Sequence, residues 1–259
     1  MIKITVLVEN TAGNKCRAEH GLSYFVEADD AVLFDTGASD LFIQNARQLG
    51  VDLSAATTVV LSHGHDDHSG GLPFLKEKRL VCHPDAFLRR FRKTDGTPLG
   101  LPMNRAKAEA LFDVATSREP VKLTERIWFL GEIPRLNDFE AKETAFCLED
   151  GSDDFTFDDS ALAILGDDGL IVVSGCAHAG ICNTIEYAVQ VTGQQKLQAV
   201  LGGFHLKKHD ELTRQTIGYL KNKNVQQVIP AHCTMLPALA AFYNEWRFVQ
   251  LKTGNILHF

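Results

Sequence analysis

The chain has 259 residues, of which 45% are hydrophobic and 23% charged, so it can bury a substantial core without disulfides or partners. Its formal net charge of −7 disfavours nucleic acid or an anionic membrane surface as the main partner. No stretch reaches the roughly 18 apolar residues that a membrane span needs, and segment 2–9 lacks the features of a signal peptide. The six cysteines are scattered along the chain. We therefore expect a cytoplasmic protein with reduced thiols.

The first quarter of the chain is predicted to contain four strands and one helix. The strand segments are rich in β-branched and aromatic residues. Residues 40–49 have the apolar spacing of a helix, and Gly50 is a typical helix end. The four predicted strands are 2–9, 22–27, 30–35 and 57–61.

The rest of the chain is predicted to be irregular up to about residue 160 and regular beyond it. Two segments have helical spacing, 86–93 and 104–113, and three others favour strands, 127–131, 144–149 and 161–165. Beyond them, a strand at 170–174 precedes a helix at about 180–192. Two further strand-to-helix units begin with strands at 198–203 and 225–230.

Six of the ten histidines are expected to lie at or just beyond the carboxyl end of an apolar strand. In layered α/β folds, this edge is where ligand sites are built, because the strand ends are rigid and the loops beyond them can vary. Residues far apart in sequence would thereby gather in one cluster. The six are His63, His65, His68, His178, His205 and His232.

The segment His63-Gly64-His65-Asp66-Asp67-His68 predicts a metal site. Residues two apart in an extended turn point the same way, so His63 and His65 can bind one cation, while Asp67 and His68 can bind a second. Neutral imidazole and carboxylate suit zinc, iron or manganese, and two such cations about 3.5–4 Å apart can hold a bridging hydroxide. The alternative, a solvated polar loop, is disfavoured by three histidines and two aspartates directly after a buried strand.

This loop resembles the His-x-His-x-Asp-His motif of the metallo-β-lactamase superfamily, and Asp35-Thr36-Gly37 is similar to the family's strand-end Asp-Thr-Gly. The resemblance covers about residues 2–258. It implies an α/β fold, the αββα sandwich of two mixed β-sheets flanked by helices, as one domain over 1–259. It also implies two divalent ions, zinc before iron or manganese. The implied ligands are His63, His65 and His178 for one ion, and Asp67, His68 and His232 for the other.

Four further segments are similar to one branch of the superfamily, named for a methanopterin-biosynthesis enzyme, 7,8-dihydropterin-6-methyl-4-(β-D-ribofuranosyl)aminobenzene 5′-phosphate synthase. The branch also has many bacterial members whose reaction the name does not imply. The segments are 19–23 (Glu-His-Gly-Leu-Ser), 174–181 (Ser-Gly-Cys-Ala-His-Ala-Gly-Ile), 202–206 (Gly-Gly-Phe-His-Leu) and 230–233 (Pro-Ala-His-Cys).

The sequence departs from the superfamily where most members carry an aspartate that bridges both metals. Here the comparable strand ends in Gly175-Cys176. Cys176 is either a thiolate ligand or, as is commoner for this residue type, a buried free cysteine.

Three more residues are candidates for the site. The resemblance implies that Asp35 orients a ligand histidine through a hydrogen bond, although it could merely cap a turn. His205 is a candidate to bind phosphate or donate a proton, and a structural histidine is the equal alternative. His20, beside Glu19, is a weaker candidate for the same substrate-binding role.

The segment 88–107 is basic in an otherwise acidic chain. It lies where the superfamily often places elements that cover the substrate, so we expect an insertion at about 85–125 that does so. Arginine would offer paired contacts to phosphate, whereas the alternative is a solvated helix face. The candidate substrate-binding residues are Arg89, Arg90, Arg92 and Lys93.

Together these features predict a dinuclear metal-dependent enzyme that acts on a small phosphorylated, pterin-like or similar, substrate. Asp67 and His205 are the candidate catalytic residues. Hydrolysis and a synthase-like transfer would use the same ligands and stay open. The alternatives are a non-catalytic metal- or ligand-binding protein and a diiron redox protein, against which His65 argues because that branch normally has glutamate there. No pattern in the sequence specifies an oligomeric state.

Overall fold

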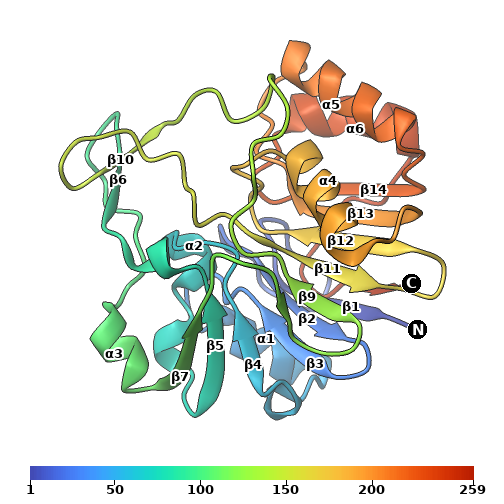
Figure 1. Cartoon of the computed structure of the whole chain (residues 1–259). Helices are drawn as coiled ribbons and strands as arrows, with labels where there is room; N and C mark the ends of the chain where they lie inside the picture. The colour runs from blue at the N-terminus through green and yellow to red at the C-terminus, as the bar shows by residue number, and fades with distance from the viewer.

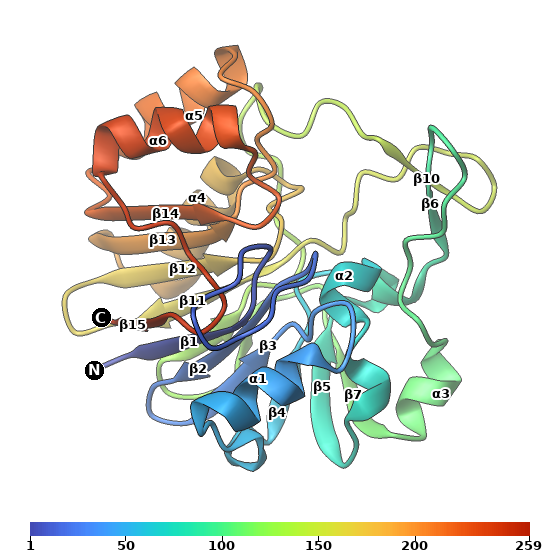
Figure 2. The same cartoon turned by 180° about the vertical axis from the view of Figure 1, so that it is seen from behind.

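Two β-sheets pack face to face, and helices cover the outer side of each, in the computed structural model of residues 1–259 (Figure 1). This is the αββα sandwich of two mixed sheets that the resemblance to the superfamily implied. The two chain ends lie close together, because the last strand pairs with the first (Figure 2). No helix combines the length and apolar character that crossing a membrane requires.

The larger sheet has seven strands in the order β15-β1-β2-β3-β4-β5-β7. Strands β15 to β3 pair in antiparallel fashion, and β3 to β7 pair in parallel. The strands are β1 (Lys3–Val8), β2 (Ser23–Glu27), β3 (Ala31–Phe34), β4 (Thr58–Val60), β5 (Lys78–Cys82), β7 (Phe112–Thr116) and β15 (Ile256–His258).

The second sheet has six strands in the order β14-β13-β12-β11-β9-β8. Strands β12, β13 and β14 are parallel, and the others pair in antiparallel fashion. The strands are β8 (Val121–Lys122), β9 (Ile127–Phe129), β11 (Ala161–Leu165), β12 (Leu170–Ser174), β13 (Leu197–Gly203) and β14 (Gln227–Ala231).

Helices α1 and α3 pack on the larger sheet, and α4 and α6 pack on the smaller one (Figures 1 and 2). Helix α5 contacts α4 and α6. Gly50 ends α1 in the left-handed conformation, as its place in the sequence predicted. The helices are α1 (Leu41–Leu49), α2 (Asp66–Ser69), α3 (Arg105–Glu109), α4 (Ile181–Thr192), α5 (Glu211–Asn222) and α6 (Leu236–Trp246), with single 3-10 turns at Leu53–Ala55, Leu72–Phe74 and Pro84–Phe87.

Alternation along the strands divides the core into three layers. On β12, Ile171 and Val173 face the other sheet, whereas Leu170 and Val172 face the helices. This period of two is what a strand buried on both sides requires. The strand ends are therefore held from both faces, and the loops that follow them start from fixed positions.

A third, two-stranded sheet projects from the sandwich (Figure 1). It consists of β6 (Arg90–Arg92) and β10 (Phe146–Leu148), which pair in antiparallel fashion. We call this pair of strands the flap. Its base is bonded to the metal loop of the sequence analysis, because Asp66 N donates to Leu99 O at 2.8 Å.

The predicted helix at 86–93 is wrong, and the one at 104–113 is too long. Residues 90–92 form a strand because they pair with β10, some 55 residues away, which local spacing cannot reveal. Helix α3 ends at Glu109, and residues 112–116 form β7, which pairs with β5. Part of the stretch at about 85–125 therefore belongs to the sandwich itself.

Candidate metal centre

The carboxyl ends of β4, β12, β13 and β14 bring the six strand-end histidines to one place, as predicted. His63 follows β4, and His178, His205 and His232 follow the other three strands. The ring centroids of His63 and His178 lie 4.8 Å apart, although 115 positions separate them in sequence.

One side of the centre is formed by three imidazoles. A nitrogen of each lies within 4.8 Å of the others, and His63 Nε2 and His65 Nδ1 are 2.9 Å apart. Burial is the main reason why the pKa of each of the three is well below its ordinary value. They are therefore neutral, which is the form that binds cations. The three are His63, His65 and His178.

The other side is formed by Asp67, His68 and His232. His232 Nε2 lies 3.1 Å from His68 Nε2 and 3.3 Å from Asp67 Oδ2, and the latter two atoms are 3.9 Å apart. His20 Nε2 is 3.2 Å from the same Asp67 oxygen. Burial opposes ionisation of Asp67, but His68 and hydrogen bonds from His20 and His232 hold its pKa well below the usual range.

Hydrogen bonds fix which nitrogen of each ring faces inward. Asp35 Oδ2 accepts from His68 Nδ1 at 2.7 Å and from Ser62 Oγ at 2.7 Å. Ser62 Oγ in turn lies 2.8 Å from His63 Nδ1. Because a carboxylate only accepts, Nδ1 of His68 carries the proton and Nε2 faces the centre. Asp35 thus lies where the predicted orienting role requires.

His232 is held in the same way by a residue that the sequence analysis did not single out. Its Nδ1 lies 3.0 Å from Asn10 Oδ1, and its backbone N donates to Glu9 Oε1 at 3.0 Å. Glu9 and Asn10 directly follow β1. The place of Asn10 at a strand end was the signal that could have identified it.

The donor set fits divalent metal ions. His65 Nε2 and His178 Nε2 are buried and have no hydrogen-bond partner, which is costly unless something binds there. Two adjacent sets, three neutral imidazoles on one side and two imidazoles with a carboxylate on the other, are ligands typical of zinc, iron or manganese.

Two cysteines and His205 complete the inner wall. Cys176 Sγ is 3.2 Å from His68 Nε2, and atoms of Cys176, His205 and Cys233 lie within 4.8 Å of one another. His205 Nδ1 is buried without a partner. Cys233 was not among the predicted site residues, although it follows His232 directly.

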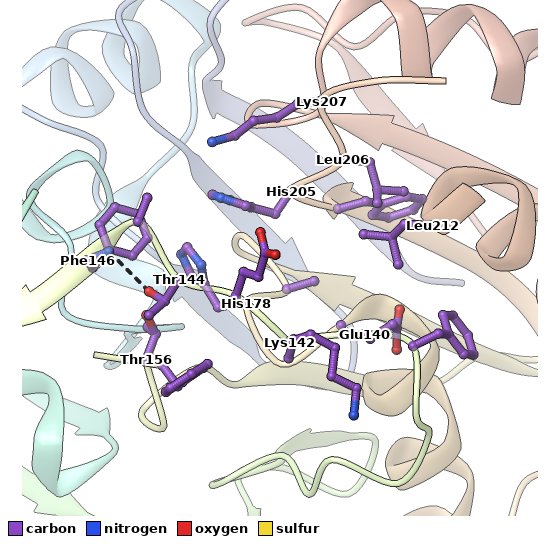
Figure 3. A pocket seen from close by; sticks show the side chains of 18 of the residues that line it. Glu140, Lys142, Thr144, Phe146, Thr156, His178, His205, Leu206, Lys207 and Leu212 are labelled. Carbon is purple, nitrogen blue, oxygen red and sulfur yellow. Dashed lines mark hydrogen bonds between the residues drawn. The ribbon is translucent and has the colours of Figure 1, made fainter. Parts of the chain in front are cut away.

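A cavity of about 490 Å³ opens beside His178 and His205 (Figure 3). Phe146 of the flap forms part of its wall, and its ring centroid is 4.7 Å from that of His65. Lys207 extends alongside His205 in Figure 3. Three exposed lysines that the sequence analysis missed line this cavity: Lys142, Lys207 and Lys208.

The basic residues predicted to bind substrate lie elsewhere. Arg92 lies on the flap, with Arg89 and Lys93 directly beside β6. The three pair with Asp95, Glu149 and Asp153 respectively. None of them lines the cavity beside His178.

Arg90 was predicted to bind substrate, but its side chain is buried and paired with two aspartates. Its side chain is 1% exposed and pairs with Asp158 at 2.8 Å and Asp154 at 3.0 Å. The same Asp158 oxygen accepts from Gly64 N at 2.7 Å, in the middle of the metal loop. Arg90 therefore links the flap to this loop.

The sequence is similar to known members of the metallo-beta-lactamase superfamily. A family model described as the metallo-beta-lactamase superfamily matches residues 16–83. The chain is 33% identical over 285 aligned residues to 7,8-dihydropterin-6-methyl-4-(beta-D-ribofuranosyl)-aminobenzene-5'-phosphate synthase of Methanocaldococcus jannaschii, covering 100% of this chain and 97% of the relative. It is 30% identical to the uncharacterized protein MJ0448 of the same organism, covering 98% and 99%.

Solved structures of related proteins superpose on the whole chain. Tm1679, described as a metal-dependent hydrolase of the beta-lactamase superfamily, superposes with a TM-score of 0.89 at 28% identity, covering 100% of this chain and 99% of that one. A diphosphatase of the PhnP family superposes with a TM-score of 0.59 at 14% identity, covering 100% and 98%, which is a likeness of fold.

Proposed function

Because this chain belongs to the metallo-β-lactamase superfamily, in the branch of the Methanocaldococcus jannaschii synthase, we propose that it is a dinuclear metal-dependent enzyme acting on a small phosphorylated substrate. The reaction is phosphoester hydrolysis or a synthase-like transfer. The relative's name supports a substrate of pterin type.

One observation carries this proposal: two groups of side chains that could each hold a metal ion lie side by side. The ring centroids of His63, from the first set, and His68, from the second, are 4.3 Å apart. The first ion would be held by His63, His65 and His178, and the second by Asp67, His68 and His232. When bound, divalent ions at these positions supply positive charge that stabilises anionic phosphate oxygens and lowers the pKa of water.

The protein's own side chains would bind and orient the substrate. Lys207, which makes no salt bridge, extends alongside His205 and would bind an anionic group there (Figure 3). His205 Nδ1 is free to hold or donate a proton at the cavity wall. Phe146 would pack on an apolar, ring-shaped part of the substrate and exclude water from the histidines.

We propose that the flap covers the substrate; its strand β6 lies within the insertion predicted at about 85–125, whereas β10 lies outside that range. The flap places Phe146 over the cavity and is anchored to the metal loop through Arg90 and Asp158. We further propose that residues 1–259 act as one domain, with this cover built into it.

The test compares metal content and turnover in the wild type and in two neighbouring variants. Asp67→Asn removes a ligand, whereas Asp66→Asn changes an adjacent, exposed carboxylate and is the matched control. Elemental analysis should find two ions per chain in the wild type and in Asp66→Asn, and fewer in Asp67→Asn. Substrates are an activated phosphodiester, a phosphomonoester and pyrophosphate.

Turnover of any of these should fall in Asp67→Asn by more than the roughly 100-fold that loss of an outer hydrogen-bond partner costs. Two ions with no turnover of these substrates would favour transfer over hydrolysis. A wild-type protein that holds no ions after purification without chelators would contradict the proposal.

A further inference from the structure

Cys176 lies where the two ligand sets meet. Ala177, with φ of 51°, turns the chain sharply after β12, so that Cys176 and His178 both lie against the histidine cluster. The sulfur is 3.2 Å from His68 Nε2, and it forms a group with His63 and His68 whose ligand atoms are all within 4.8 Å of one another. The side chain is 4% exposed.

His63 belongs to the first ligand set and His68 to the second. Among the clusters of His, Cys, Asp and Glu side chains with ligand atoms within 4.8 Å of one another, one contains both His63 and His68, and its third member is Cys176. We propose that Cys176 Sγ is the ligand shared by the two ions, as a bridging thiolate. This inference rests on the proposed function, because it needs both ions to bind.

The carboxylates nearby are engaged in other ways. Asp35 accepts hydrogen bonds from His68 Nδ1 and Ser62, behind the ring rather than at its inner nitrogen. Gly175 makes this arrangement possible, because a Cβ there would lie 2.1 Å from Ser62 Oγ. The Asp67 carboxylate contacts His20 and His232 instead. The Cys176 sulfur is thus the donor between His63 and His68 that becomes negative when it loses its proton.

Cys233 is close to Cys176 but occupies a different position. Its sulfur accepts from His205 N at 3.3 Å and lies 3.7 Å from the backbone oxygen of Cys176. Gly203 leaves room for it, since a Cβ there would be 2.6 Å from this sulfur. Cys233 therefore positions the backbone of its neighbours, and it is the matched control for Cys176.

Binding involves no change of oxidation state. The Cys176 thiol releases its proton to solvent, and the sulfur donates its electrons to the cations. A thiolate is a softer donor than the carboxylate that most of the superfamily uses at the bridge. The centre should consequently favour zinc, cobalt or cadmium over manganese or magnesium.

Cobalt(II) absorption tests the inference without reliance on turnover. Metal-free protein is loaded with two equivalents of Co²⁺, and the near-ultraviolet thiolate-to-cobalt charge-transfer band is recorded. The wild type and Cys233→Ser should show the band. Cys176→Ser should lack it and bind the second cobalt at least tenfold more weakly, and Cys176→Asp should hold two cobalt ions without the band. Circular dichroism of each variant checks that it is folded.

Two bound cobalt ions without the band, a band that persists in Cys176→Ser, or an equal loss of the band in Cys233→Ser would each overturn the bridging role. The first of these results would leave the dinuclear centre intact. Failure of the wild type to bind cobalt at all would instead refute the proposed function, and this inference with it.

Discussion

Four of the nine non-glycine residues with positive φ lie at the site or directly beside its candidate ligands. Asp35, Ala177, His205 and His232 all have positive φ, between 50° and 57°, which is uncommon for residues other than glycine. Each lies just past the end of a strand, where the chain must turn at once for the side chain to reach the centre. Such strain persists only where the surrounding structure holds it in place, and it is characteristic of functional sites.

Asp35 is the residue whose removal should reveal this organisation most directly. In Asp35→Asn, His68 loses its carboxylate partner, and we expect the affinity of the second metal position to fall by roughly 10–100-fold. Competition with a chromophoric chelator measures this affinity. Asp168→Asn, which changes an exposed carboxylate, is the control, and equal affinities in the two variants would show that Asp35 does not orient His68.

At the level of elements, the flap is fastened to the metal loop rather than freely hinged. Arg90 on β6 bonds to Asp158, and Asp158 also accepts a hydrogen bond from Gly64 N, between His63 and His65. The ion pair is buried on both sides, with Arg90 1% and Asp158 0% exposed. Gly64 itself packs so closely on Ala86 that a Cβ would lie 2.1 Å from the carbonyl oxygen there.

Arg90→Ala would leave Asp154 and Asp158 buried without their cation. Removing one partner of a buried ion pair typically costs about 3–5 kcal/mol, so we expect the free energy of unfolding to fall by that order. Arg89→Ala, one position away but 71% exposed, should change it by no more than about 0.5 kcal/mol. Urea unfolding measures the free energy of unfolding of the two variants, and similar values for both would mean that the buried ion pair does not hold the flap in place.

At the scale of the whole molecule, the proposed metal ligands come from both sheets. His63, His65, Asp67 and His68 follow β4 of the larger sheet, whereas His178 and His232 follow strands of the smaller one. Each proposed ion is therefore bound by residues from both halves of the sandwich. Metal binding should stabilise the packing of one sheet on the other, because the unfolded chain cannot present this arrangement.

Removal of metal should consequently lower the melting temperature. Each ion at 100 times its dissociation constant contributes about 2.7 kcal/mol, which for a chain of this size corresponds to roughly 5–10 °C for each ion. Thermal unfolding with zinc and after chelation measures the difference. His232→Ala should show a smaller shift, because it loses the ligand that the smaller sheet gives to the second ion. An equal shift would argue that this ion does not join the sheets.

Most elements of the fold could be predicted from sequence because their patterns are local. The strands that became β1 to β4 and β11 to β14 have apolar and β-branched runs, and α1 and α4 have helical spacing. The metal loop could be identified for the same reason, since its six residues are contiguous. The helix predicted at 86–93 failed because its apolar residues suit either state, and pairing with β10 decided between them.

The sequence by itself determined that histidines and aspartates follow apolar strands, which is enough to predict a metal site, and the resemblance of its metal loop to the superfamily implied the sandwich around it. The tertiary structure alone decided which neighbours complete that site. Asn10, Cys233 and Lys207 are brought there by separate strands, and Arg90 was drawn inward by Asp158 instead of facing substrate. The physical reason is that ligand position and charge pairing depend on distances between strand ends, and these distances are set by packing the two sheets together.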